Sequence, residues 1–249
     1  MLAAGLALAV VIGAALGLLG GGGSILTVPL LHYVFGLETH AAIAGSLGVV
    51  AVTAVVALVP YARRGQVQWR TGGLFGTASM VGSFGAARVA RHVPPAVLLV
   101  AFALVMLGAA ASMLRSGVRV PSARSLAPGL AVGLGVLVGG VAGFVGAGGG
   151  FLIVPTLTAF AQLAIHDAIG TSLLVIAMNS TAGFAGAYAA DLDLERLAMI
   201  AGATITGSIA SSLLAHRISP TRLRLAFGWL LVGMGLVVLG SEAPGLLGY

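Results

Sequence analysis

The residues Gly17-Leu-Leu-Gly20-Gly21-Gly22-Gly23-Ser24-Ile-Leu-Thr-Val28-Pro29 are the first of two related stretches that decide the fold. The second is Gly143-Phe-Val-Gly146-Ala-Gly148-Gly149-Gly150-Phe-Leu-Ile-Val154-Pro155, and each of its positions lies 126 residues after its counterpart. Both lie inside long uncharged apolar sequence. Each glycine within a helix costs about 1 kcal/mol relative to alanine, so neither stretch predicts an unbroken helix. We expect a broken helix at each, with the opened backbone facing a cavity rather than lipid.

The composition is that of an integral membrane protein. The chain has 249 residues, of which 59% are hydrophobic and only 7% are charged, whereas soluble domains carry about 25% charged residues. All twelve basic residues are arginines, and the net charge is +6. They lie mostly in short loops between apolar segments, where membrane topology explains them better than nucleic-acid binding. We therefore expect a multi-pass protein of the cell inner membrane that binds no nucleic acid.

The sequence lacks cysteine and lacks the motifs of two common classes of hydrolase. It contains no cysteine, which rules out disulfides, thiolate metal sites and cysteine nucleophiles. It also contains no His-Glu-x-x-His and no Gly-x-Ser-x-Gly motif, the signatures of zinc proteases and serine hydrolases. We expect no enzymatic activity, no cofactor and no metal.

The chain repeats itself well beyond the glycines. The offset of 126 residues extends from Leu31 and Leu157 to Leu47 and Leu173, and after a one-residue gap it becomes 125. We call residues related by these offsets equivalent. The pattern predicts a single membrane domain, 1–249, with repeat one at 1–115, a connector at 116–126 and repeat two at 127–249. Helical segments are expected at 2–19, 24–36, 41–61, 70–89 and 96–115, and again at 127–145, 150–163, 167–189, 196–215 and 221–240.

The orientation of the two repeats depends on whether the chain crosses the membrane at the glycines or turns back. As a helix, 24–36 spans about 20 Å at 1.5 Å per residue, which is too short for a core of about 30 Å. If the chain turns back, the arginines divide nine to three between the two sides. If it crosses, they divide seven to five. Basic residues favour cytoplasmic loops, so we predict an all-α protein of two inverted repeats. Each repeat has a glycine-broken helical hairpin and three transmembrane helices, and both termini lie outside.

The two breaks predict a site for an anion. The N-terminus of a short helix presents unpaired backbone N–H groups and about half a positive charge, and two such ends together bind an anion without a charged side chain. Pro29 and Pro155 are expected to loosen or bend the short helices. The alternative is that the glycines serve close helix packing. The predicted substrate-binding residues are Gly20, Gly22, Gly23 and Ser24 in repeat one, and Gly146, Gly148, Gly149 and Gly150 in repeat two.

A polar motif opens the next helix of each repeat. Its residues line the cavity in one interpretation, and in the other they form hydrogen bonds between helices worth about 1 kcal/mol per pair. His40 and His166 are candidates for proton coupling, although a histidine at a helix start often only caps or meets water. The further substrate-binding candidates are Ser46 and Thr53 in repeat one, and Thr171, Ser172 and Asn179 in repeat two.

These motifs, Gly20 to Pro29 and Gly146 to Pro155 followed by Ala42 to Leu47 and Ala168 to Leu173, resemble those of the TauE/SafE sulfite exporter family. The resemblance covers nearly the whole chain and implies a secondary transporter of sulfite or organosulfonates, working outward across the lipid bilayer. The first repeat departs from the Gly-Thr-Ser-Leu pattern found at Gly170. An anion channel stays open as an alternative, as does a membrane enzyme or assembly factor that transports nothing. The sequence does not fix the exact substrate, the direction, the coupling ion or the oligomeric state.

Overall fold

The structure is a computed structural model that describes residues 2–37, 39–90, 103–104, 107–111, 113–115, 128–145, 150–186 and 193–246. All regular elements within these ranges are helices, so the predicted all-α class is confirmed. The connector 116–126 and half of the predicted segment 96–115 lie outside the described residues. The elements are α1 (Leu2–Leu19), α2 (Gly22–Pro29), a π-helix (Leu30–Val34), α3 (Thr39–Arg63), α4 (Trp69–Ala90), α6 (Pro128–Val145), α7 (Gly150–Ala159), α8 (Ile165–Gly186), α9 (Leu194–Leu214), a 3-10 turn (Ala215–Arg217) and α10 (Pro220–Leu246).

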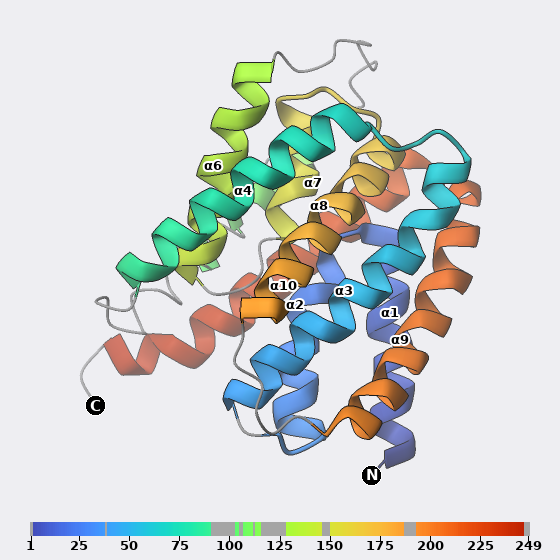
Figure 1. The fold of residues 1–249 in the computed structure, drawn as a ribbon, viewed down its shortest axis with the longest axis vertical. Helices are drawn as coiled ribbons and strands as arrows, with labels where there is room; N and C mark the ends of the chain where they lie inside the picture. Colours follow the sequence, from blue (N-terminus) through green and yellow to red (C-terminus); the bar gives the residue numbers. More distant parts are fainter. Residues whose placement is uncertain are drawn as a thin grey trace.

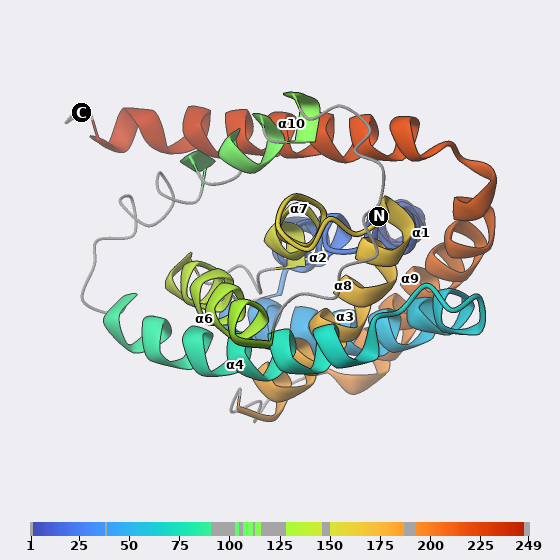
Figure 2. The same ribbon diagram turned by 90° about the horizontal axis from the view of Figure 1, so that it is seen from above.

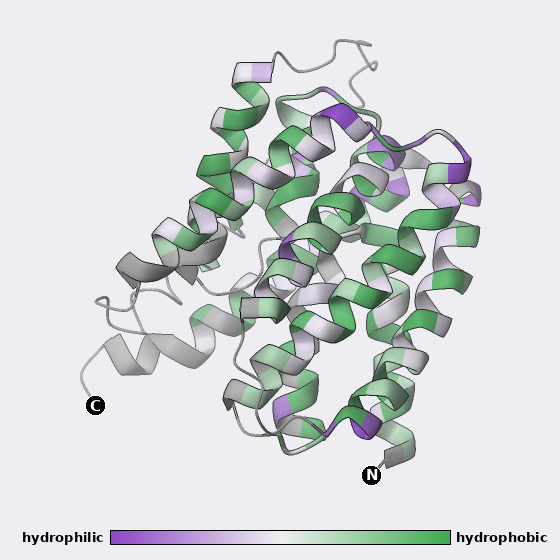
Figure 3. Cartoon of the chain, in the orientation of Figure 1, coloured by the Kyte–Doolittle hydropathy of each residue, from purple (hydrophilic) through white to green (hydrophobic). Residues whose placement is uncertain are grey.

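The helices have the length and hydropathy of membrane spans. Among the described residues, three are long and apolar enough to cross a bilayer, at Ala44–Arg63, Ile165–Ala185 and Leu194–Leu214. Shorter apolar helices occupy Ala3–Leu19 and Pro128–Val141. Figure 3 shows the polar residues gathered mainly at the ends of the helices, with apolar residues between them. The chain is an integral membrane protein.

The chain reverses direction at the first glycine break. A Cβ added to Gly23 would lie 2.6 Å from the carbonyl oxygen of Ile12, so the start of α2 packs on the backbone of α1. Further along, a Cβ on Gly5 would lie 2.8 Å from the ring of Phe35. The segment after the break therefore returns along α1 to the end at which α1 began.

The long helices pack in two reciprocal pairs, α1 on α9 and α6 on α4. A Cβ on Gly13 would collide with the carbonyl group of Thr204, and one on the equivalent Gly139 would collide with that of Ser79. The opposite sides of both interfaces match as well: Gly207 meets the backbone of Val10, and Gly82 meets that of Val136. Close approach of backbones at small residues is the usual way in which membrane helices associate.

Equivalent helices run in opposite directions. In Figure 1, α1 and α3 rise from the end near the N-terminus, whereas α6 and α8 descend toward that end; α4 descends and α9 rises. Figure 2 shows the short helices α2 and α7 in the middle, between α10 on one side and α3, α4 and α8 on the other. The two broken segments are thus enclosed by the long helices.

Both short helical segments end in the same cap. The backbone N–H of Leu37 donates to the carbonyl of Leu31 at 3.0 Å, and that of Leu163 donates to Leu157 at 3.2 Å. The residues just before them, Gly36 and Gln162, have φ of 68° and 51°. In each cap the residue after the left-handed one donates to the carbonyl six positions back, one residue wider than the bond of a Schellman motif, and this likewise satisfies a late helical carbonyl.

Candidate functional site

The first glycine break is a tight turn held by the next helix. Gly20 has φ of +67°, in the left-handed region that glycine adopts without strain. The turn leaves carbonyls at the end of α1 without helical partners. The hydroxyl of Tyr61, which is fully buried in α3, donates to the carbonyl of Gly17 at 2.8 Å. The break is therefore a built feature in which a side chain satisfies the freed backbone.

The N-termini of α2 and α7 meet each other. A Cβ added to Gly150 would lie 2.9 Å from the Oγ of Ser24 and 3.0 Å from the Cα of Gly21. Ser24 and Gly150 are equivalent residues, so the two broken segments touch at matching positions. The hydroxyl of Ser24 donates to the carbonyl of Gly21 at 2.7 Å. Two helix N-termini thus bring their partial positive charges to one place.

Residues of the second half close the site around the first break. A Cβ on Gly20 would collide with the Oγ of Ser172, and it would lie 3.2 Å from a methyl group of Val154. Ser172 is fully buried in α8, and its hydroxyl donates to the carbonyl of Ile169 at 2.8 Å. The structure therefore brings together four of the predicted residues: Gly20, Ser24, Gly150 and Ser172. The predicted Gly22 and Gly23 form the first turn of α2 beside them.

The polar residues Thr53 and Asn179 lie at helix interfaces. The hydroxyl of Thr53 in α3 is 2.9 Å from that of Thr204 in α9. The Nδ2 of Asn179 in α8 donates to the Oγ of Ser79 in α4 at 3.0 Å. These are the hydrogen bonds between helices that the sequence offered as the alternative to lining a cavity. The two bonds join equivalent pairs of residues, because Thr53 is equivalent to Asn179 and Thr204 to Ser79. Asn179 differs in that its buried Oδ1 has no hydrogen-bond partner.

The remaining described candidates are tied to loops and helix ends. Thr171, which is buried, accepts a hydrogen bond at 3.0 Å from the backbone N–H of Gln68, just before α4. The Nε2 of His166 lies 3.1 Å from the carbonyl of Ala215 at the end of α9. Ser46 is buried within α3. Three predicted residues, Gly146, Gly148 and Gly149, and the side chains of His40 and Pro29 lie outside the described residues, while Pro155 lies within α7.

Several residues at these interfaces were missed by sequence reasoning. Thr204 and Ser79 are themselves equivalent, at the offset of 125, and both are polar in otherwise apolar helices. That match was a signal in the sequence for paired partners of Thr53 and Asn179. No comparable signal marked Tyr61. Its partner is the backbone carbonyl of Gly17 on another helix, and a backbone carbonyl is present at every residue, so the residue type reveals nothing.

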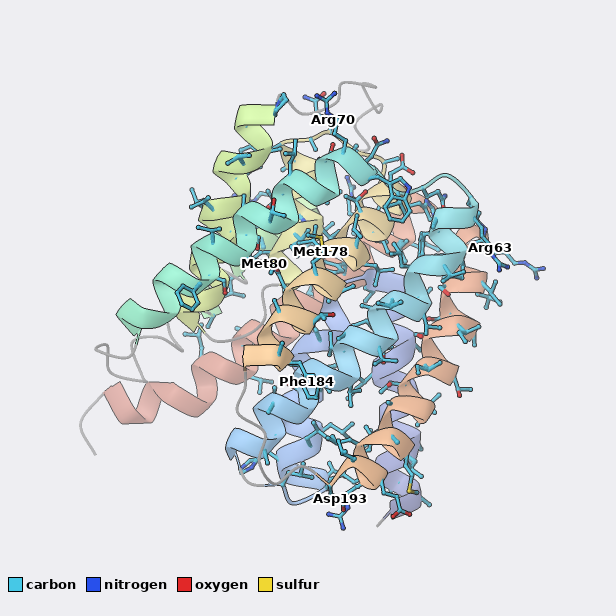
Figure 4. The ribbon with its side chains drawn as sticks, viewed as in Figure 1. Arg63, Arg70, Met80, Met178, Phe184 and Asp193 are labelled. Atoms are coloured by element: carbon cyan, nitrogen blue, oxygen red, sulfur yellow. The ribbon has the colours of Figure 1, made fainter. Side chains whose placement is uncertain are left out.

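Several of the charged groups lie at the ends of the helices. Figure 4 shows Arg63 and Arg70 at one end of the molecule and Asp193 at the other. Asp193 caps the start of α9 and forms an exposed ion pair with Arg196, with an N–O distance of 3.6 Å. Among the described residues, no group of three histidines or carboxylates is placed to hold a metal ion. The centre of the site therefore relies on backbone and hydroxyl groups.

Comparison with known proteins gives the family. The family model described as "Sulfite exporter TauE/SafE" matches residues 5–238. The chain belongs to the TauE/SafE sulfite exporter family. This member is similar to a probable membrane transporter protein of Xylella fastidiosa, with 34% identity over 239 residues that cover 92% of this chain and 91% of that protein. It is also similar to a probable membrane transporter protein of Methanocaldococcus jannaschii, with 26% identity over 94% of this chain and 95% of the relative.

A third relative, the probable membrane transporter protein YdhB of Bacillus subtilis, is 28% identical over 70% of this chain and 74% of its own length. No solved structure matches the chain. The family and the relatives' names identify this TauE/SafE protein as a membrane transporter rather than an enzyme. The resemblance drawn from the sequence motifs is confirmed.

Proposed function

We propose that this transporter carries small sulfur-containing oxyanions, sulfite or organosulfonates, out of the cell. The anion binds where the N-termini of α2 and α7 converge. The observation that carries the proposal is the contact of Ser24 with Gly150, which places two helix N-termini side by side in a protein of the sulfite exporter family. An oxyanion is stabilised there by backbone N–H groups and by the helix dipoles.

The contact also limits how the anion binds. The space at Gly150 is tight, because an added methyl group would lie 2.9 Å from the Oγ of Ser24 and 3.0 Å from the Cα of Gly21, so that these groups would have to shift. An oxyanion can therefore lie between the N-termini of α2 and α7 only if the two N-termini move apart. We propose that the described conformation is closed at this point and that binding opens it. Gly22, Gly23 and the glycines at 146, 148 and 149 then present backbone N–H groups, with Ser46, Thr171 and Ser172 nearby.

We further propose that the chain consists of two inverted repeats, 1–115 and 127–249, joined by 116–126 in the inner membrane. The reversal at Gly20, the opposite directions of equivalent helices and the reciprocal packing of α1 on α9 and α6 on α4 support this arrangement. The opposite placement of Arg63 and Asp193 supports a cytoplasmic side at the end of α3, because basic loops stay inside. His40 and His166 are the candidates for proton coupling.

The proposal is tested by flux in liposomes containing the purified protein. Radiolabelled sulfite, sulfate, thiosulfate, taurine and sulfoacetate are supplied one at a time, with and without a pH gradient. We expect saturable uptake of sulfite or a sulfonate that an imposed proton gradient drives above equilibrium. Uncoupled conductance would indicate an anion channel instead, and absence of flux for all five anions would overturn the proposed function.

A further inference from the structure

Arg224 differs from the other described arginines in how its guanidinium group is placed. It lies one turn inside α10 and is partly buried, and its Nε is buried without a hydrogen-bond partner. No carboxylate among the described residues forms an ion pair with it. A buried N–H donor without an acceptor is costly. An arginine that keeps such a donor buried in a membrane protein is therefore a candidate for a functional role.

The helix that carries Arg224 shares the large apolar core with α1 and with the short helix α7. Leu223 and Phe227, on the adjoining face of α10, are buried in the same apolar cluster as Leu16 and Val154. These two residues belong to α1 and α7, next to the breaks. The helix α10 also packs on α1, α2 and α8. Arg224 thus stands on a helix that packs on α2, one of the two short helices.

Membrane topology alone does not account for this arrangement. Arg222, two residues earlier on the same helix, is exposed, and an exposed arginine is sufficient to hold a loop on the cytoplasmic side. Burial of the Nε of Arg224 adds nothing to that role. The residue equivalent to Arg224 is Leu99, so the charge belongs to one half only, whereas the glycine motif is present in both.

We propose that Arg224 is a binding residue for the transported anion, paired with it on the route between the helix N-termini and the arginine-rich end. This inference rests on the proposed function and extends it to a named charged side chain. Guanidinium binds sulfite or sulfonate oxygens through paired N–H donors. The planar group offers its Nε and a terminal nitrogen on one edge, and the anion supplies the acceptor that the buried Nε lacks.

The decisive variant is Arg224→Met, with Arg222→Met as the matched control on the same helix. Replacing a side chain that buries an unpaired donor with an apolar side chain of similar length removes the desolvation cost of that donor. We therefore expect Arg224→Met to unfold at a higher temperature in detergent without substrate, and to require about tenfold more sulfite or sulfonate for half-maximal uptake. The maximal rate should change far less than the KM. Arg222→Met should match the wild type in KM.

A second variant tests the charge itself without relying on the first. The chain has no cysteine, so Arg224→Cys introduces one thiol, and 2-bromoethylamine alkylates it with loss of bromide to a thioether that bears an ammonium group. Sulfite does not cleave that bond. We expect alkylation to lower the KM of Arg224→Cys toward that of the wild type, whereas iodoacetamide, which adds no charge, should not.

The outcomes separate this inference from the proposed function. If the wild type transports none of the five anions, the proposed function fails and this inference fails with it. If the wild type transports an anion and Arg224→Met has an unchanged KM, only this inference is overturned. Arg224 would then extend its terminal nitrogens to the interface as a topological arginine does.

Discussion

Ser24 and Gly150 stand 126 residues apart in the sequence, yet a Cβ on Gly150 would lie 2.9 Å from the Oγ of Ser24. They occupy the same position of the repeated motif. One carries a side chain and the other carries none, and the contact leaves room for only one. The two halves are therefore complementary, and not identical, at the point where they meet.

This relationship predicts the effect of restoring symmetry. Gly150→Ser should impair uptake and destabilise the protein by about 1–3 kcal/mol, because an inserted side chain meets the Oγ of Ser24 and the backbone of Gly21. Adding Ser24→Gly moves the single hydroxymethyl group to the other half and should recover part of both losses. Uptake and thermal unfolding in detergent check this. Wild-type behaviour of Gly150→Ser alone would show that the two N-termini do not meet.

The predicted topology is checked with single cysteines in the naturally cysteine-free chain. Arg63 is exposed at the C-terminal end of α3, and Glu195 is exposed at the N-terminal end of α9. We expect Arg63→Cys to resist an impermeant maleimide added to intact cells, and Glu195→Cys to react, because the arginine-rich end faces the cytoplasm. Permeabilised cells serve as the control in which both react. Labelling of both from outside would exclude the inverted arrangement.

The matched interhelical hydrogen bonds predict different results in the two halves. Thr53→Val removes the bond to Thr204 and should lower stability by about 0.6 kcal/mol without changing the KM for substrate. Asn179→Leu removes the bond to Ser79 and also the unpartnered Oδ1. We expect Asn179→Leu to lower stability and to raise the KM for substrate, since the Oδ1 of Asn179 accepts no hydrogen bond from the protein. An unchanged KM for Asn179→Leu would leave it a packing residue.

The two left-handed caps, at Gly36 and Gln162, predict opposite effects of exchanging glycine. Gln162 holds φ of 51°, a conformation that costs a residue other than glycine about 1 kcal/mol. Gln162→Gly should therefore raise the unfolding temperature. At Gly36, with φ of 68° and nothing within 4 Å of an added Cβ, Gly36→Ala should lower it through backbone strain alone. Thermal unfolding in detergent checks both, and equal shifts in the same direction would contradict the assignment.

The candidate proton-coupling residues are tested by replacing both histidines with glutamine. His40→Gln combined with His166→Gln should abolish accumulation driven by a pH gradient, because imidazole is the side chain that titrates near neutral pH. Exchange of substrate across the membrane should persist. His166→Gln alone keeps a donor for the carbonyl of Ala215 and controls for structural loss. Gradient-driven accumulation that survives the double replacement would place coupling elsewhere.

Much of the secondary structure could be predicted from the sequence, because the signals are local. The expected helix over 2–19 matches α1 (Leu2–Leu19), and the segment expected from 150 begins as α7 does, at Gly150. Each glycine weakens a helix by about 1 kcal/mol, and apolar length sets where a helix can lie in a membrane. The expected segment 24–36 was less accurate, since α2 ends at Pro29 and a π-helix continues to Val34.

The sequence by itself determined that this chain is a helical membrane protein with a glycine motif repeated 126 residues apart, because hydropathy and backbone preference act within a few residues. Only the tertiary structure decided which distant residues meet. It placed Ser24 against Gly150 and Thr53 against Thr204, and it left the Nε of Arg224 buried without a partner. Such contacts depend on how helices more than a hundred residues apart pack together, and no local spacing along the chain specifies them.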